Sequence, residues 1–136
     1  MSLEVNHGPI LIDNNLFLSP ELAQIKLSQG VSFVHNTIAW KIWPTGVKDD
    51  RRTPYLTPHS TEIAGLHDCP CGNTSYFNNL FLRADLTPYN ECLLPVHLEG
   101  NLYLSESRPS QYDLNAQTDS VSTPQILIIK EKGGWF

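Results

Sequence analysis

One short pattern, an asparagine followed by alternating apolar residues, returns four times along the chain. Its asparagines are Asn15, Asn36, Asn79 and Asn101. The first two are 21 residues apart, the last two 22, and the middle interval of 43 residues equals about two such units. Gly8 and Gly30 repeat the same interval of 22 residues. A fixed period of this length is typical of a solenoid, in which each repeat stacks on its neighbours.

The residues within each unit indicate the type of solenoid. Segments such as 9–12 and 31–34 are short and apolar, and they are separated by Gly, Asn and Pro, as strands between tight turns are. Only residues 20–25 allow a turn or short helix. Asn also tolerates the left-handed backbone that a tight corner needs. We therefore predict an all-β fold, a right-handed parallel β-helix of about four to five coils with the asparagines stacked at one corner; an antiparallel β-sandwich is the alternative.

The pattern lapses twice, and these lapses set the expected organisation. Residues 1–106 are predicted to form the coils, with an inserted loop over 41–71 that leaves the stack. Long loops inside a repeat are usually functional. Residues 107–136 are predicted to be a linker followed by a β segment whose second strand is truncated. We expect the chain to be the C-terminal piece of a longer protein.

Composition excludes several classes of function. The net charge of −5 disfavours nucleic acid as a partner. The sequence contains no run of 18 apolar residues, which a membrane span would need. Cys69, Cys71 and Cys92 are predicted to be reduced, which, with no visible signal peptide, favours a cytoplasmic location. One residue separates Cys69 from Cys71, fewer than in zinc sites, and no phosphate-binding or nucleotide motif is present. We predict no metal and no cofactor.

The densest polar group beside an apolar strand lies near the start of the chain. Strand alternation places Leu3 and Val5 on one face and Glu4 and Asn6 on the other. If Val5 points into the stack, Glu4 and Asn6 project onto the outer surface, where a solenoid carries its ligand groove. Without further information, Glu4 would be an ordinary solvated carboxylate.

The stretches that follow resemble glycoside hydrolase family 120, a family of β-xylosidases. They occur in the same order, over about residues 4–105, and include residues 4–15, 28–30, 35–36, 52–55, 59–62, 78–79, 87–89 and 100–101. The resemblance implies a parallel β-helix that cleaves xylose from oligosaccharides with retention of configuration. It assigns Glu4 the role of general acid/base. It also places the aspartate nucleophile one coil before Glu4, so we expect this chain alone to be inactive.

The same alignment of repeats predicts the neighbours of the site. Superposing Gly8 on Gly30 stacks Lys26 near Glu4, and a lysine there favours the ionised carboxylate, the opposite of what a general acid needs. The candidate substrate-binding residues are Asn6, His7, Trp43, His59 and Glu62. For His7 the alternative is a hydrogen bond within the corner, and for His59 and Glu62 a plain loop contact.

The expected partner is a xylose-containing oligosaccharide, together with further copies of the chain, because unpaired strand edges recruit partners. The main alternative is a non-catalytic β-helix, either an interaction or carbohydrate-binding module or a truncated gene product. A polysaccharide lyase on the same architecture would want an acidic Ca²⁺-binding cluster, which the sequence lacks.

Overall fold

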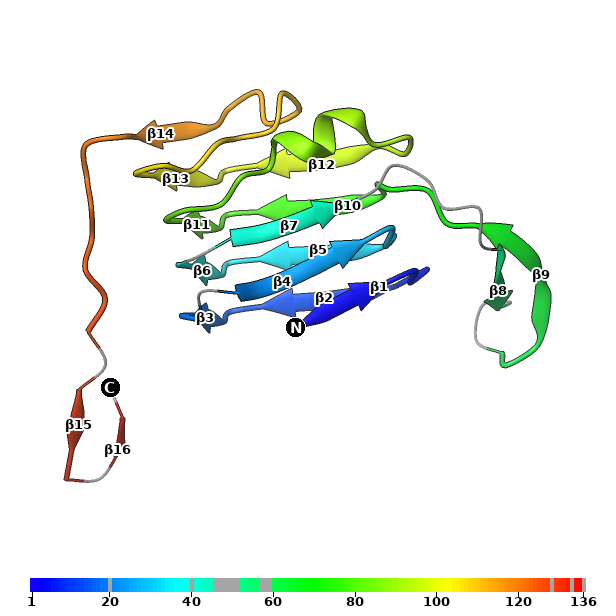
Figure 1. Cartoon of the computed structure of the whole chain (residues 1–136), viewed down its shortest axis with the longest axis horizontal. Helices are drawn as coiled ribbons and strands as arrows, with labels where there is room; N and C mark the ends of the chain where they lie inside the picture. The colour runs from blue at the N-terminus through cyan, green and yellow to red at the C-terminus, as the bar shows by residue number, and fades with distance from the viewer. Residues whose placement is uncertain are drawn as a thin grey trace.

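The computed structural model describes residues 1–19, 21–39, 41–45, 52–56, 60–127, 129–132 and 134–135, and its strands form three parallel sheets (Figure 1). The first sheet contains β1 (Ser2–Glu4), β4 (Glu21–Lys26) and β7 (Lys41–Thr45). The second contains β2 (Ile10–Asp13), β5 (Val31–Val34), β10 (Thr74–Phe77) and β12 (Val96–Glu99). The third contains β3 (Leu16–Phe17), β6 (Thr37–Ile38), β11 (Leu80–Phe81), β13 (Leu102–Leu104) and β14 (Gln117–Asp119).

Successive repeats of the sequence stack as successive layers. Each of the first three layers supplies one strand to each sheet in turn, and in the fourth the short 3₁₀ helix η1 (Thr87–Glu91) lies against β7. The repeat length sets the register, because Ile10 pairs with Val31 and Thr74 with Val96. The fold is thus all-β with stacked parallel sheets, as in β-helix-like proteins.

The four repeating asparagines form a ladder at the corner between the second and third sheets, which confirms their predicted stacking. The Nδ2 of Asn15 donates to Oδ1 of Asn36 at 3.1 Å. Asn36 donates likewise to Asn79, and Asn79 to Asn101, both at 3.0 Å. Asn36, Asn79 and Asn101 are buried, and Asn101 donates in turn to the buried carboxylate of Asp113 at 3.0 Å. Each buried amide is therefore satisfied by the coils around it.

The backbone at the corners takes the left-handed conformation that the turn residues allow. The residues before the ladder asparagines, namely Asn14, His35, Asn78 and Gly100, all have φ between 54° and 68°. At the corner between the first and second sheets, Gly8 and Gly30 approach so closely that a Cβ on Gly8 would lie 2.7 Å from the Gly30 carbonyl oxygen. Only glycine fits this contact, which confirms that the two glycines stack.

The core runs through the interior of the stack as columns of similar side chains. Phe33 stacks on Tyr76 with ring centroids 4.9 Å apart, and Phe81 on Tyr103 at 5.0 Å. All four are buried, since their strands turn alternate side chains inward. The hydroxyl of Tyr76 meets that of Tyr89 at 2.7 Å, which satisfies both polar groups inside the apolar core.

Two segments differ from the sequence-based expectation because their backbones pair with neighbouring strands. The turn or short helix allowed over 20–25 is replaced by β4, which pairs in parallel with both β1 and β7. Consequently β7 belongs to the stack, although the predicted loop began at residue 41. Within that loop, β8 (Arg52–Leu56) and β9 (Ile63–Asp68) form an antiparallel hairpin that projects beside the stack (Figure 1).

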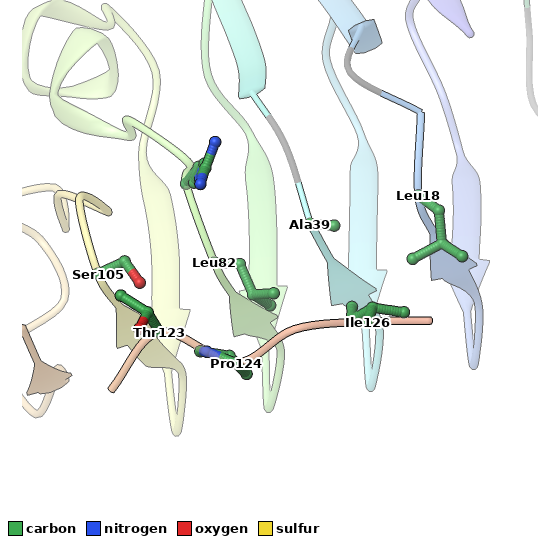
Figure 2. A pocket seen from close by; sticks show the side chains of 8 residues that line it. Leu18, Ala39, Leu82, Ser105, Thr123, Pro124 and Ile126 are labelled. Atoms are coloured by element: carbon green, nitrogen blue, oxygen red, sulfur yellow. The ribbon is translucent and has the colours of Figure 1, made fainter. Parts of the chain in front are cut away.

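The C-terminal region is more ordered than the predicted linker. Strand β14 pairs with β13, and Asp113 is buried under the asparagine ladder. The following segment crosses the ends of the third-sheet strands, where Thr123, Pro124 and Ile126 cover a cavity of about 270 Å³ (Figure 2). Near the end, β15 (Lys130–Glu131) pairs with β16 (Gly134–Trp135) in a short antiparallel hairpin, although the second strand of this segment was expected to be truncated.

The prediction of three reduced cysteines was wrong for two of them. Cys71 and Cys92 form a disulfide between adjacent layers, with their Cα atoms 4.9 Å apart. They are separated by 21 residues, one repeat, which stacking brings together. Cys69 is a buried thiol that donates to the Leu27 carbonyl oxygen at 2.6 Å.

We expect thiol labelling of the unfolded, unreduced protein to modify Cys69 alone, and labelling after reduction to modify all three cysteines, because a disulfide does not react with the reagent. Intact-mass spectrometry gives the number of labels. A Cys92→Ser variant should gain a label at Cys71 without reduction. Labelling of all three cysteines in the unreduced native sequence would contradict the pairing.

Candidate functional site

Glu4 ends strand β1 and lies on the outer surface of the first sheet. Its neighbour Leu3 packs against the core, so alternation turns Glu4 outward, where 46% of its side chain is exposed. Glu4 is in register with Lys26 on β4, and its Oε1 lies 3.3 Å from the lysine Nζ. The stacking of Lys26 on Glu4 that the sequence predicted is therefore present. Among the described strands, β1 is the edge of its sheet, with β4 on its other side.

The corner that follows β1 is held to the next layer by its backbone. The Val5 N–H donates to the Lys26 carbonyl oxygen at 2.9 Å, and the Asn6 carbonyl oxygen accepts from the Gln29 N–H at 2.7 Å. The Asn6 side chain reaches the Gln29 carbonyl oxygen at 3.5 Å. These contacts fix the direction in which the chain leaves Glu4, and they leave Asn6 half-buried beside Gln29.

His7 joins this corner to the inserted hairpin. Its Nε2 lies 2.6 Å from Oγ1 of Thr53 on β8, and its ring is edge-on to Tyr55, with centroids 5.4 Å apart. Tyr55 meets the ring of His67 on β9 in a similar way at 5.3 Å. A segment more than 45 residues away in the sequence is thus positioned against the residue three places after Glu4. This hydrogen bond of His7 is made to the hairpin, whereas the alternative expected from the sequence was a bond within the corner.

A cavity of about 230 Å³ lies between this corner and the hairpin. It is lined by His7, Gln29, Tyr55, His67, Asp68, Pro70 and Leu94. Of these residues, His7 alone was among the predicted substrate-binding residues. Thr53 and Tyr55 could have been found from their spacing, because two residues apart on a strand share one face, but their pairing with His7 needed the tertiary structure.

Burial lowers the pKa of His7 below its ordinary value of 6.5, and the neighbouring His67 lowers it further. The unfolded chain therefore binds a proton at His7 at a higher pH than the folded chain. Between pH 6.5 and the lower pKa of His7 in the folded state, the unfolded state binds more protons. The stability contributed by neutral His7 is therefore complete above about pH 6.5 and falls as the pH drops.

We expect the free energy of unfolding to decrease on acidification below pH 6.5, and part of this decrease to disappear in a His7→Gln variant. Urea unfolding of both proteins between pH 5 and 8 measures this difference, because the remaining histidines are common to the two. An NMR titration that placed the pKa of His7 at or above 6.5 would contradict it.

The described part of the structure covers the other predicted binding residues only in part. Trp43 belongs to β7, and its side chain is outside the described part of the structure, as is the whole of His59. Glu62 is exposed beside Ser60 at the start of β9, near the tip of the hairpin. The larger cavity under the C-terminal segment lies at the opposite ends of the coils from Glu4 and is mainly apolar (Figures 1 and 2). The titratable and hydrogen-bonding side chains around His7 therefore lie at the smaller cavity.

Within the described ranges, no three His, Cys, Asp or Glu side chains are grouped so that they could hold a metal ion. Over those same residues, no helix is long and apolar enough to cross a membrane.

Comparison with known proteins gives one informative similarity. No protein-family model matches the chain, and neither does any curated protein sequence. Among solved structures, the chain is similar to one described as "The complex structure of XylC with xylose", with a TM-score of 0.86 and 25% sequence identity. The chain has the fold of part of XylC. The similarity covers 98% of this chain but only 25% of XylC, so the chain spans about a quarter of that protein's length.

Proposed function

We propose that this chain is part of a retaining glycoside hydrolase that acts on xylose-containing oligosaccharides, folded as a right-handed parallel β-helix and related to the family 120 β-xylosidases. The observation that carries the proposal is the similarity of nearly the whole chain to XylC, whose solved structure contains xylose. The ordered resemblance of residues 4–105 to that family supports the same conclusion from the sequence.

In this proposal Glu4 is the general acid/base. A retaining glycosidase needs two carboxyl groups about 5–5.5 Å apart, and neighbouring strands of a sheet are about 4.8 Å apart. Two outward carboxylates in register on adjacent coils therefore meet the requirement. Within the sheet, Lys26 on β4 lies on one side of Glu4. The second carboxylate therefore belongs on a strand that pairs with the other edge of β1.

Lys26 suits the second half of such a reaction. Before the sugar is transferred, a negative nucleophile beside Glu4 would favour the protonated acid and oppose the effect of Lys26. Once the sugar is bound to the nucleophile that charge is gone, and Lys26 favours the ionised Glu4. The ionised form is the base that the attacking water needs.

The anomeric configuration of the first product tests the proposal. A protein that contains this chain together with a strand paired to the open edge of β1 should release β-xylose first from an aryl β-xyloside, whose leaving group has no anomeric centre, as followed by proton NMR. The present 136-residue chain alone should release none, because the proposed nucleophile lies on that added strand. Release of α-xylose first, or no release by the longer protein, would overturn the proposal.

A non-catalytic carbohydrate-binding module is the second candidate, favoured by the ion pair between Glu4 and Lys26. Such a module would bind xylobiose without turning it over in any longer form. The expected homo-oligomer stays a proposal supported by the strands β1, β2 and β3, each of which is the edge of its sheet. A cytoplasmic location loses part of its support, since two of the three cysteines that favoured it form a disulfide.

A further inference from the structure

A groove across the ends of the third-sheet strands takes one residue from each of the four layers. Each of these residues directly follows a strand of that sheet, namely Leu18 after β3, Ala39 after β6, Leu82 after β11 and Ser105 after β13. The Ala39 N–H donates to the Phe17 carbonyl oxygen of the layer before at 3.0 Å, and the Leu82 N–H is bonded to the second layer in the same way. The groove therefore runs along the axis of the stack, across the direction of the strands (Figure 2).

The segment over residues 121–127 is anchored at one end of this groove. Asp119, the last residue of β14, accepts hydrogen bonds from the N–H groups of Val121 and Ser122 at 2.9 and 3.0 Å. The Ser122 carbonyl oxygen accepts a further bond from Oγ of Ser105 in the fourth layer, at 2.9 Å. The segment is therefore a strap that starts from a fixed point beside the fourth layer.

From that point the strap crosses the layers in the order from fourth to first (Figure 2). Pro124 has a restricted backbone and keeps the preceding Thr123 extended, so the strap loses little conformational entropy when it docks. Ile126 lies at the ends of the first two layers, beside Ala39 and Leu18. It is 38% exposed, so it buries more than half of its surface there. The strap thus reaches the first layer through an apolar contact.

The layers of a solenoid contact only their nearest neighbours. The strap is an exception, because it starts beside the fourth layer and reaches the first. Among the described strands, β1, β2 and β3 each have a partner on one side only, whereas β4, β5 and β6 have one on each side. The first layer therefore gains most from a further contact. We propose that the strap holds the first layer, and with it Glu4, against the rest of the stack, whether or not Glu4 is catalytic.

Amide hydrogen exchange of the 136-residue chain, followed by mass spectrometry, tests this role. Ile126→Lys places a charge against the apolar groove and close to Arg83, which also lines the cavity under the strap. We expect this variant to exchange the amides of residues 2–18 about tenfold faster than the native chain, because the first layer opens more often when the strap is detached. Exchange over residues 96–104 of the fourth layer should stay unchanged.

Leu127→Lys is the matched control, because Leu127 is 72% exposed and is not part of the lining, so this variant should exchange like the native chain. Ile126→Leu keeps an apolar side chain and should also retain native exchange. Native exchange in Ile126→Lys, or equal acceleration by the two lysine variants, would overturn the strap contact. Equal acceleration over residues 2–18 and 96–104 would overturn its specific hold on the first layer.

Discussion

Replacement of Glu4 by alanine is expected to lower the hydrolysis of xylobiose by about 10²–10⁴-fold in a protein that contains this chain and the second carboxylate, because a positioned general acid contributes about that factor. Xylose is a poor leaving group and departs slowly without a proton. Glu4 is exposed at the end of β1 and contacts Lys26, so its loss should leave the fold intact. Steady-state rates on xylobiose measure the effect.

Activated aryl β-xylosides separate the two roles of Glu4. Their leaving groups depart without protonation, so the Glu4→Ala variant should release a rapid burst of phenol and then stall at the sugar-bound intermediate, which lacks its base. Azide should restore turnover, since a small anion attacks without a base. Glu99→Ala is the matched control, because Glu99 also ends a strand of the stack and is exposed. Normal turnover of xylobiose by the Glu4→Ala variant would return Glu4 to the role of a surface carboxylate.

Replacement of Asn79 by alanine is expected to destabilise the protein by about 1–3 kcal/mol, because it leaves a buried polar group without a partner. The Asn79 Oδ1 accepts from the backbone N–H and the Nδ2 of Asn36, and its Nδ2 donates to the Phe33 carbonyl oxygen and to Asn101. Alanine removes all four bonds and takes from the buried backbone N–H of Asn36 its acceptor, whereas the Oδ1 of Asn101 keeps the bond from the backbone N–H of residue 79. The midpoint of urea unfolding, with the slope unchanged, measures the loss.

The same ladder provides the control for this prediction. Asn15 is exposed at the first position of the ladder, where it donates to Asn36 and to the Asp13 carbonyl oxygen. Water can replace its bonds, so Asn15→Ala should cost no more than about 1 kcal/mol. Equal losses for the two substitutions would show that the buried ladder does not stabilise the stack.

The candidate site could be predicted only in part. Strand alternation and the repeat length were enough to place Glu4 outward and to stack Lys26 on it, because both depend on local periodicity. The contact of His7 with Thr53 was out of reach, since it joins segments 46 residues apart. A repeat describes what stacks on what, but an inserted hairpin has no counterpart in the other coils and its docking follows no period.

The layers of this protein follow from the spacing of its residues alone. Residues one repeat apart must meet when coils stack. The spacing therefore predicts the asparagine ladder, the Gly8–Gly30 contact and the register of the strands. The 21-residue separation of Cys71 and Cys92 fits the same rule. Tertiary contacts set the elements whose partners lie outside that period. Residues 41–45 pair with the second edge of β4. Asp113 is buried where it accepts a hydrogen bond from the last asparagine of the ladder. The hairpin forms one wall of the cavity beside His7. In each case a segment distant in the sequence buries a hydrogen-bonding or apolar surface that one coil leaves exposed. Such a contact leaves no local pattern in the sequence.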